Sequence, residues 1–272
     1  MLNGILKRHR LKFGFTFLLV LAEAAAGLLF PLFIGLAVDD AIVGSDEGVV
    51  KLGLLGLVAL LIGTGRRFFD SRFYSQIYQE LGLRIISKME NASTSVKSAR
   101  LGMIGELVEF LENALPELIN ALIGLAGVII MIAMLNLKVF YGSLIVTFLI
   151  FLIYWMSASK TIRLNRAMND EQEKQVAVIS RLDSNALATH LTRTMRWNIK
   201  LSDLEAVNFS ASWVLLIGFL VVTILLAANE GVVKYGAMLS LIMYVFQFME
   251  SITNLPFFYQ SWLRLKEMCS RF

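Results

Sequence analysis

The sequence contains very little cysteine, histidine and proline: one, two and three residues respectively among 272. A single cysteine, Cys269, excludes an intrachain disulfide and a cysteine-rich metal site. His9 and His190 are too far apart for a histidine-based metal motif. Alternation of apolar and polar residues with a period of two is also absent, which argues against a transmembrane β-barrel. No nucleophile–base pair or metal constellation appears, so the sequence supports no enzyme chemistry, no cofactor and no bound metal.

Apolar residues are what the chain has in abundance. They make up 57% of the sequence, and the mean hydropathy is +0.68, which is too apolar for an ordinary soluble domain of this length. We therefore expect an all-α integral membrane protein. The formal charge of +4 is small and is sorted along the chain, so it gives no reason to expect a nucleic-acid partner.

Six apolar runs are long enough to cross a bilayer, which requires about 17–25 residues per helix. The first is too long for a secretory signal, and no cleavage pattern follows it. The predicted spans form a single six-helix transmembrane domain and cover residues 13–38, 49–65, 118–135, 139–158, 207–228 and 233–258.

Two long polar segments separate these runs, at residues 66–117 and 159–206. In the first, apolar residues recur at helical spacing, so the second helix is expected to continue as an amphipathic stalk to about Asn91 and to return after a polar turn at 92–100. In the second segment the expected turn is Asp183–Asn185, which leaves helical arms of roughly 25 residues, or about 35 Å.

Lysine and arginine are distributed very unequally between the two sides that these spans define. Of the 25 basic residues, 22 fall on the side of the termini and of the two polar segments, and only Lys51, Lys138 and Lys234 fall on the other. The positive-inside rule therefore predicts that both termini and both excursions are cytoplasmic. We expect the protein in a bacterial inner membrane.

Three stretches of sequence resemble the transmembrane domain of exporter-type ATP-binding cassette (ABC) transporters. Residues 30–42 resemble the end of that family's first span, with Pro31 followed by Asp39 at the outer boundary. Residues 231–240 followed by Pro256 are similar to its sixth span, and residues 263–272 to its connector. The resemblance implies a domain-swapped dimer, either a homodimer or a pair with a related membrane subunit.

The sequence departs from that family in two respects. It contains no G-x-x-x-x-G-K-[ST] phosphate loop, because Gly63-Thr-Gly65 is followed by two arginines, and it has no Leu-Ser-Gly-Gly-Gln signature. The resemblance therefore implies an ATPase on a separate chain. The second excursion is also shorter than the family's usual arm. The expected docking residues for the ATPase lie in the two polar turns: Ser93, Lys97, Arg100, Asp183, Ser184 and Asn185.

Ionisable residues near membrane depth are candidates for binding substrate or protons. Glu23 and Glu250 fall in the inner halves of the first and sixth spans, and Gln247 lies one helical turn from Glu250. The alternative for each carboxylate is exposure to a water-filled cavity without a specific role.

Further candidates lie at the predicted ends of the spans. Arg66 and Arg67 face either an anionic ligand or the lipid headgroups, by snorkelling. Glu117 is the acidic residue of the first excursion nearest to the apolar run.

The sequence favours a membrane subunit of an ABC-type transporter that works by alternating access and uses a separate ATPase. A second hypothesis keeps the fold and replaces ATP by a proton gradient, as in family-like peptide-uptake proteins without an ATPase. A third is a non-transporting membrane scaffold that binds a partner on its cytoplasmic stalks.

Overall fold

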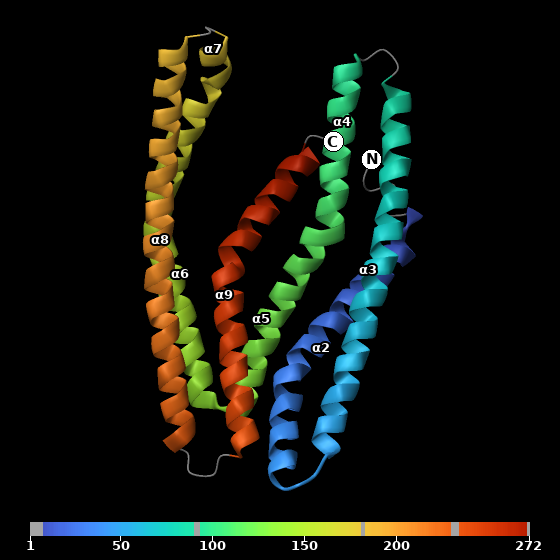
Figure 1. Cartoon of the computed structure of the whole chain (residues 1–272), viewed down its shortest axis with the longest axis vertical. Coiled ribbons are helices and arrows are strands. Elements are labelled where there is room, and N and C mark those ends of the chain that lie inside the picture. Colours follow the sequence, from blue (N-terminus) through green and yellow to red (C-terminus); the bar gives the residue numbers. More distant parts are fainter. Residues whose placement is uncertain (1–7, 90–92, 181–182, 230–233, 271–272) are drawn as a thin grey trace. The chain divides into compact units, whose positions relative to one another are not determined.

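The computed structural model describes residues 8–89, 93–180, 183–229 and 234–270, the last of these by backbone alone from residue 255 onward. The described residues form helices and no strand (Figure 1). The elements are α2 (Arg10–Ile42), α3 (Glu47–Lys88), α4 (Thr94–Glu109), η1 (Phe110–Ala114), α5 (Leu115–Leu135), α6 (Leu137–Glu173), α7 (Gln175–Ile179), α8 (Ser184–Asn229) and α9 (Tyr235–Ser270). Six helices in this part of the chain are long and apolar enough to cross a membrane. The predicted all-α membrane fold is confirmed.

The turns differ in detail from those expected. The polar segment 92–100 is mostly helical, because α4 already begins at Thr94, and α3 ends at Lys88 rather than Asn91. In the second excursion the chain breaks earlier than expected, at Lys174, and the short helix α7 precedes Asp183. Asn136, which lies between the third and fourth predicted spans, alone separates α5 from α6 and has an extended backbone. The connection between the fifth and sixth predicted spans, residues 229–232, lies mostly outside the described residues.

The chain divides into two compact units. Unit 1 comprises residues 1–137 and 227–272 and contains α2, α3, α4, η1, α5 and α9. Unit 2 comprises residues 138–226 and contains α6, α7 and most of α8.

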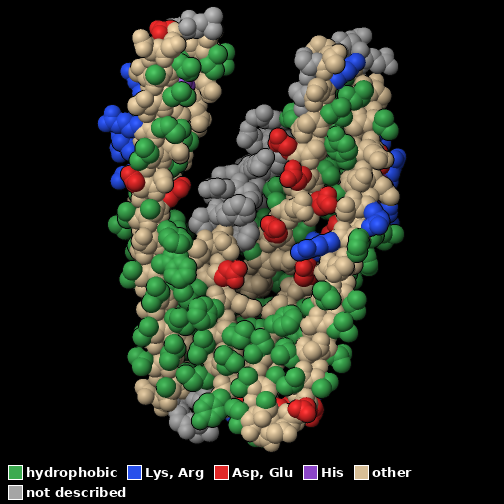
Figure 2. Space-filling view, in the orientation of Figure 1, with side chains coloured by type: hydrophobic (Ala, Val, Ile, Leu, Met, Phe, Trp, Pro, Cys, Tyr) green, Lys and Arg blue, Asp and Glu red, His purple; other side chains and the backbone are tan. Residues whose placement is uncertain are grey.

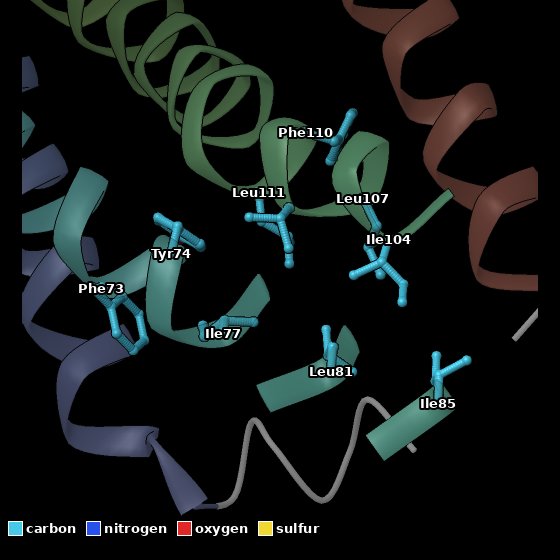
Figure 3. Close-up of a cluster of buried hydrophobic side chains, with 10 residues drawn as sticks. Phe73, Tyr74, Ile77, Leu81, Ile85, Ile104, Leu107, Phe110 and Leu111 are labelled. Carbon is cyan, nitrogen blue, oxygen red and sulfur yellow. The ribbon is translucent and has the colours of Figure 1, made fainter. Parts of the chain in front are cut away.

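The largest buried cluster of unit 1 lies between α3 and the α4–η1 segment. Its members recur at helical spacing on both elements, as the amphipathic pattern of the first excursion predicts. They are Phe73, Tyr74, Ile77, Leu81 and Ile85 on one side and Ile104, Leu107, Val108, Phe110 and Leu111 on the other (Figure 3). Phe13 of α2 adds an edge-to-face contact to Phe73, with ring centroids 4.9 Å apart. These contacts hold the stalk together and attach it to α2.

Helices α2 and α9 are joined by hydrogen bonds around a proline. Pro31 lacks an N–H and leaves the carbonyl of Gly27 without its helical donor. Gln247 Nε2 of α9 donates to this carbonyl at 3.3 Å, and Tyr244 Oη donates to the Leu28 carbonyl at 2.7 Å. Ser240 Oγ donates to the Pro31 carbonyl at 2.8 Å. In a membrane, where water cannot solvate these carbonyls, the α9 side chains stabilise the proline-containing part of α2.

Two glycines allow the backbones of α2 and α9 to meet near the other end of this seam. A Cβ atom on Gly236 would lie 2.6 Å from the Gly35 carbonyl carbon and 2.8 Å from Asp39 Cγ. Asp39 Oδ1 accepts the backbone N–H of Gly236 at 2.8 Å. Asp39 therefore satisfies a donor in the first turn of α9.

In unit 2, α6 and α8 form an antiparallel hairpin. Ser157 Oγ donates to Asn208 Oδ1 at 2.7 Å, and the ring of Phe219 packs against Gly142. The hairpin is closed beyond the apolar segments by the buried pair Glu171 and His190, whose Oε1 and Nδ1 atoms lie 3.2 Å apart. This pair fixes the register of the two long arms.

Candidate functional site

A charged network links α2 and α3 inside unit 1. Arg66 Nε donates to Glu23 Oε2 at 2.6 Å, and Arg66 Nη1 donates to Asp70 Oδ2 at 3.1 Å. The other oxygen of Asp70 accepts the Thr16 hydroxyl at 2.7 Å. We call these four residues the α2–α3 charge network. It places two carboxylates on one guanidinium and therefore carries a net negative charge when all three groups are ionised.

Helical spacing explains how the network forms. Arg66 and Asp70 are four residues apart on α3 and so lie on one face of that helix. Gly63, one turn earlier, lies beside the Glu23 carboxylate, which would be in ordinary van der Waals contact with a Cβ atom at that position, 3.5 Å away. On α2, Thr16 and Glu23 are seven residues apart and share the face that packs on α3.

Burial differs sharply within the network. The exposed fraction of the side chain is 3% for Asp70, 13% for Arg66 and 30% for Glu23. Glu23 is 16 residues from Asp39 along α2, a rise of about 24 Å. Measured along α2 from Asp39, Glu23 therefore falls near the far edge of a hydrocarbon layer of about 30 Å. Asp70 is buried between two hydrogen-bond partners, whereas the Glu23 side chain remains partly exposed.

Arg66 and Arg67 behave differently although they are adjacent. Arg66 turns inward to the two carboxylates, so the interpretation of Arg66 as a snorkelling headgroup contact is wrong. Arg67 is exposed.

The other membrane-depth candidates do not join the network through any contact seen in the described residues. Glu250 lies on an exposed face of α9, and Glu117 is exposed in the first turn of α5. Gln247 is directed into the helix seam by its bond to Gly27, while its Oε1 atom is buried without a hydrogen-bond partner. Asn120 Oδ1 of α5 is likewise buried without a partner. The structure therefore brings Glu23 and Arg66 together and leaves Glu117 and Glu250 on the surface of unit 1.

The α4–α5 segment contains a π-helical turn, η1, directly before Pro116. Such turns insert one extra residue and are frequent at functional positions. Glu112 lies in this turn and Glu109 directly precedes it. Figure 2 shows acidic side chains along the face that α4, η1 and α5 present in the view.

The expected docking residues of the first excursion lie at the start of α4. Ser93 precedes the helix, and its carbonyl accepts the Lys97 N–H at 3.0 Å. Lys97 and Arg100 are thus helical residues rather than turn residues.

The second set of expected docking residues lies at the tip of unit 2. Asp183 Oδ1 accepts the N–H groups of Asn185 and Ala186 at 2.9 and 3.3 Å, so Asp183 caps α8. Ser184 and Asn185 are exposed in the first turn of that helix. This second set of docking residues therefore lies at the capped N-terminus of α8 and not in the turn expected from the sequence.

The Glu171–His190 pair stabilises this tip by joining α6 to α8. Glu171 also accepts Lys174 Nζ at 3.0 Å. The hydrogen bond from Lys174, followed by that from His190, lowers the pKa of Glu171 below its ordinary value. A cavity of about 360 Å³ lies beside the pair and is lined by residues including Asp183 and Asn185.

Two members of the network, Asp70 and Thr16, were not identified from the sequence. The Arg66–Asp70 spacing of four residues is a signal that would have identified Asp70. Thr16 has no such signal, because its role depends on the packing of α2 against α3. Among the described residues, no group of three or more His, Cys, Asp or Glu side chains is arranged to hold a metal ion.

The six long apolar helices of the described residues and the two helical excursions between them define an integral membrane protein. A family model described as ABC transporter transmembrane region matches residues 2–236. The chain belongs to this family. None of the curated proteins compared with it matches.

Proposed function

We propose that the protein is the membrane subunit of an ABC-type transporter that forms a dimer, moves its substrate by alternating access and is energised by an ATPase on a separate chain. The family match over residues 2–236 carries this proposal. The dimer pairs either two copies or one copy and a related subunit. The basic ends of the helices face the cytoplasm.

The tip of unit 2 supports the ATPase part of the proposal. An ATPase can move the membrane-spanning helices only through a contact surface that is rigidly attached to them. The tip has a capped helix start at Asp183 and a buried hydrogen-bonded pair, Glu171 with His190, next to it. The exposed Ser184 and Asn185 then offer the contact surface.

A bulky substitution at the tip tests the proposal. We expect Mg-ATP hydrolysis to accompany the protein when it is purified from its own membranes, and Ser184→Tyr to abolish its co-purification. Ser202→Tyr makes the same change at another exposed position of α8 and should leave the activity bound. ATP hydrolysis that never accompanies the protein, or that survives Ser184→Tyr unchanged, would overturn the use of this tip by an ATPase.

A second candidate function is proton-driven transport on the same fold, and the α2–α3 charge network favours it. Glu23 is the more exposed of the two carboxylates in the network, and its partner Arg66 also contacts Asp70. Protonation of Glu23 would release one of the two bonds of Arg66, so that a proton and a change in helix contact are coupled.

The test for this candidate is flux under a pH gradient without ATP. Proteoliposomes containing the wild-type chain should accumulate a cationic peptide or dye, and Glu23→Gln should abolish the dependence on the gradient. Glu205→Gln changes an exposed carboxylate of α8 and serves as the control. Flux that is independent of the gradient in all three proteins rejects the proton-driven candidate and leaves the ATPase-dependent one.

A further inference from the structure

Unit 2 contains a second polar site, remote in sequence from the α2–α3 charge network. It is a cavity of about 640 Å³ between α6 and α8. We call it the α6–α8 pocket. Its lining combines the basic residues Lys160, Arg163 and Lys200 with Asp203, Trp197 and several apolar side chains.

The polar lining is predominantly basic. Lys160 and Arg163 are three residues apart on α6, and Lys200 faces them from α8, while Asp203 is the one acidic residue in the lining. None of the three basic groups forms an ion pair with a carboxylate in the described part of the chain. Three positive charges and one negative charge leave an excess of two, so the pocket favours an anion. Figure 2 shows Lys and Arg side chains gathered along the α8 side of unit 2.

Trp197 and the apolar lining residues make part of the pocket hydrophobic. Lys200 Nζ lies over the Trp197 ring, 4.5 Å from its centroid, which holds the ammonium group at the pocket. Leu164 is 7% exposed and, with Leu204, provides an apolar wall. A ligand that fills this pocket therefore has both an anionic and an apolar part.

The position along the helices indicates where such a ligand comes from. The apolar segment of α6 ends at Ala158, two residues before Lys160, and that of α8 begins at Val207, which itself lines the pocket. Tryptophan and basic side chains concentrate at this boundary between hydrocarbon and water. The pocket thus opens at the level of lipid headgroups.

We propose that the α6–α8 pocket binds the phosphate headgroup of an anionic phospholipid. Lys160, Arg163 and Lys200 contact the phosphate, and the Leu164–Leu204 wall contacts the first part of the acyl chains. A soluble phosphate compound shares the anionic chemistry but makes no use of the apolar wall. The lipid links α6 to α8 at the membrane surface, between the Ser157–Asn208 bond and the Glu171–His190 pair.

Lipid binding to the delipidated full-length protein in detergent tests this proposal. Native mass spectrometry would measure dissociation constants for short-chain phosphatidylglycerol, short-chain phosphatidylcholine and glycerol 3-phosphate. We expect saturable binding of phosphatidylglycerol at least tenfold tighter than of either other compound. Because a basic side chain near the surface contributes about 1 kcal/mol, the double variant Arg163→Gln/Lys200→Gln should weaken phosphatidylglycerol binding about thirtyfold.

The matched control is Arg166→Gln/Arg196→Gln. These arginines are exposed on the same two helices but do not line the pocket, so the control removes the same charge and should change affinity less than threefold. Asp203→Asn should tighten binding about fivefold, since it removes the one opposing charge. Quenching of tryptophan fluorescence by brominated phosphatidylglycerol should lose a saturable component in Trp197→Phe.

Three results would overturn the proposal. Equal affinity for phosphatidylglycerol and phosphatidylcholine would show that charge does not select the ligand. An equal loss of affinity in the control variant would show that overall charge acts rather than this pocket. Binding of glycerol 3-phosphate as tight as that of phosphatidylglycerol would assign the pocket to a soluble phosphate compound.

Discussion

Replacement of Arg66 by glutamine removes the shared partner of two carboxylates. Asp70, which is 3% exposed, would keep only the Thr16 hydroxyl as a partner. The Glu23 side chain is 30% exposed, so water would partly replace Arg66 as the partner of its carboxylate. Removing one member of a buried ion pair costs about 3–5 kcal/mol, and the partial exposure of Glu23 places the expected cost near the lower limit, about 3 kcal/mol.

Thermal unfolding in a fixed detergent, followed by loss of the monodisperse gel-filtration peak, measures this effect. For a chain of this size a loss of about 3 kcal/mol corresponds to a decrease in Tm of about 6–12 °C. Arg67→Gln is the matched control, because the neighbouring arginine is exposed. It should shift Tm by no more than about 2 °C.

A double variant distinguishes the loss of charge balance from a general packing defect. Arg66→Gln/Asp70→Asn removes the buried carboxylate together with its partner, and it should recover more than half of the lost Tm. Unfolding of Arg66→Gln at the same temperature as Arg67→Gln would show that Arg66 does not stabilise the two carboxylates. A double variant that loses as much stability as the two single variants together would show that Arg66 and Asp70 do not stabilise each other.

Three further predictions concern the α2–α9 seam and the tip of unit 2. Gly236→Ala places a methyl group 2.6 Å from a carbonyl carbon of α2 and should cost about 1–3 kcal/mol. At Gly27 nothing lies within 4 Å of an added Cβ atom, so Gly27→Ala should change the stability by no more than about 1 kcal/mol. Thermal unfolding measures both glycine variants. Tyr244→Phe removes the donor to the Leu28 carbonyl and should cost about 1–2 kcal/mol in the same assay. Because the pKa of Glu171 is lowered in the folded chain, its stabilisation of the tip is present above the ordinary pKa of 4.5 and is lost as pH falls below it, through the folded pKa.

Each of these predictions has a contradicting result. Equal melting of Gly236→Ala and Gly27→Ala would mean that the two backbones are not in close contact. An unchanged Tm in Tyr244→Phe would mean that water or another group satisfies the Leu28 carbonyl. Hydrogen exchange at α7, corrected for intrinsic rates between about pH 3 and 6, should rise toward acid pH in the wild type and be flat in Glu171→Gln. A parallel rise in both proteins would exclude Glu171 as the titrating group.

The membrane fold could be predicted because its signals are local. Each crossing helix is a continuous apolar run, and the stalk pattern at Phe73, Ile77 and Leu81 reappears in the buried cluster of unit 1. Helix ends were less predictable. The polar residues after Thr94 are compatible with either a turn or an exposed first turn of a helix, and the structure has the helix.

The contacts of the candidate site depend on packing between distant segments. The sequence indicates that Glu23 is an expensive membrane-depth carboxylate, but its partner is 43 residues away. Helical spacing places Gln247 beside Glu250, yet Gln247 donates a hydrogen bond to the carbonyl of Gly27, 220 residues away. In both cases the sequence identifies which polar groups need a partner, and only the arrangement of the helices decides which partner they obtain.

Transport by the purified protein with its associated proteins, reconstituted in one set of vesicles, tests the central claim most directly. Flux of a cationic peptide or dye would be measured with ATP alone, with a pH gradient alone and with neither. The account predicts flux under ATP that disappears when the ATPase is removed and is unaffected by collapse of the pH gradient. Absence of flux under both energy sources, across substrates of differing charge, would contradict the assignment as a transporter subunit.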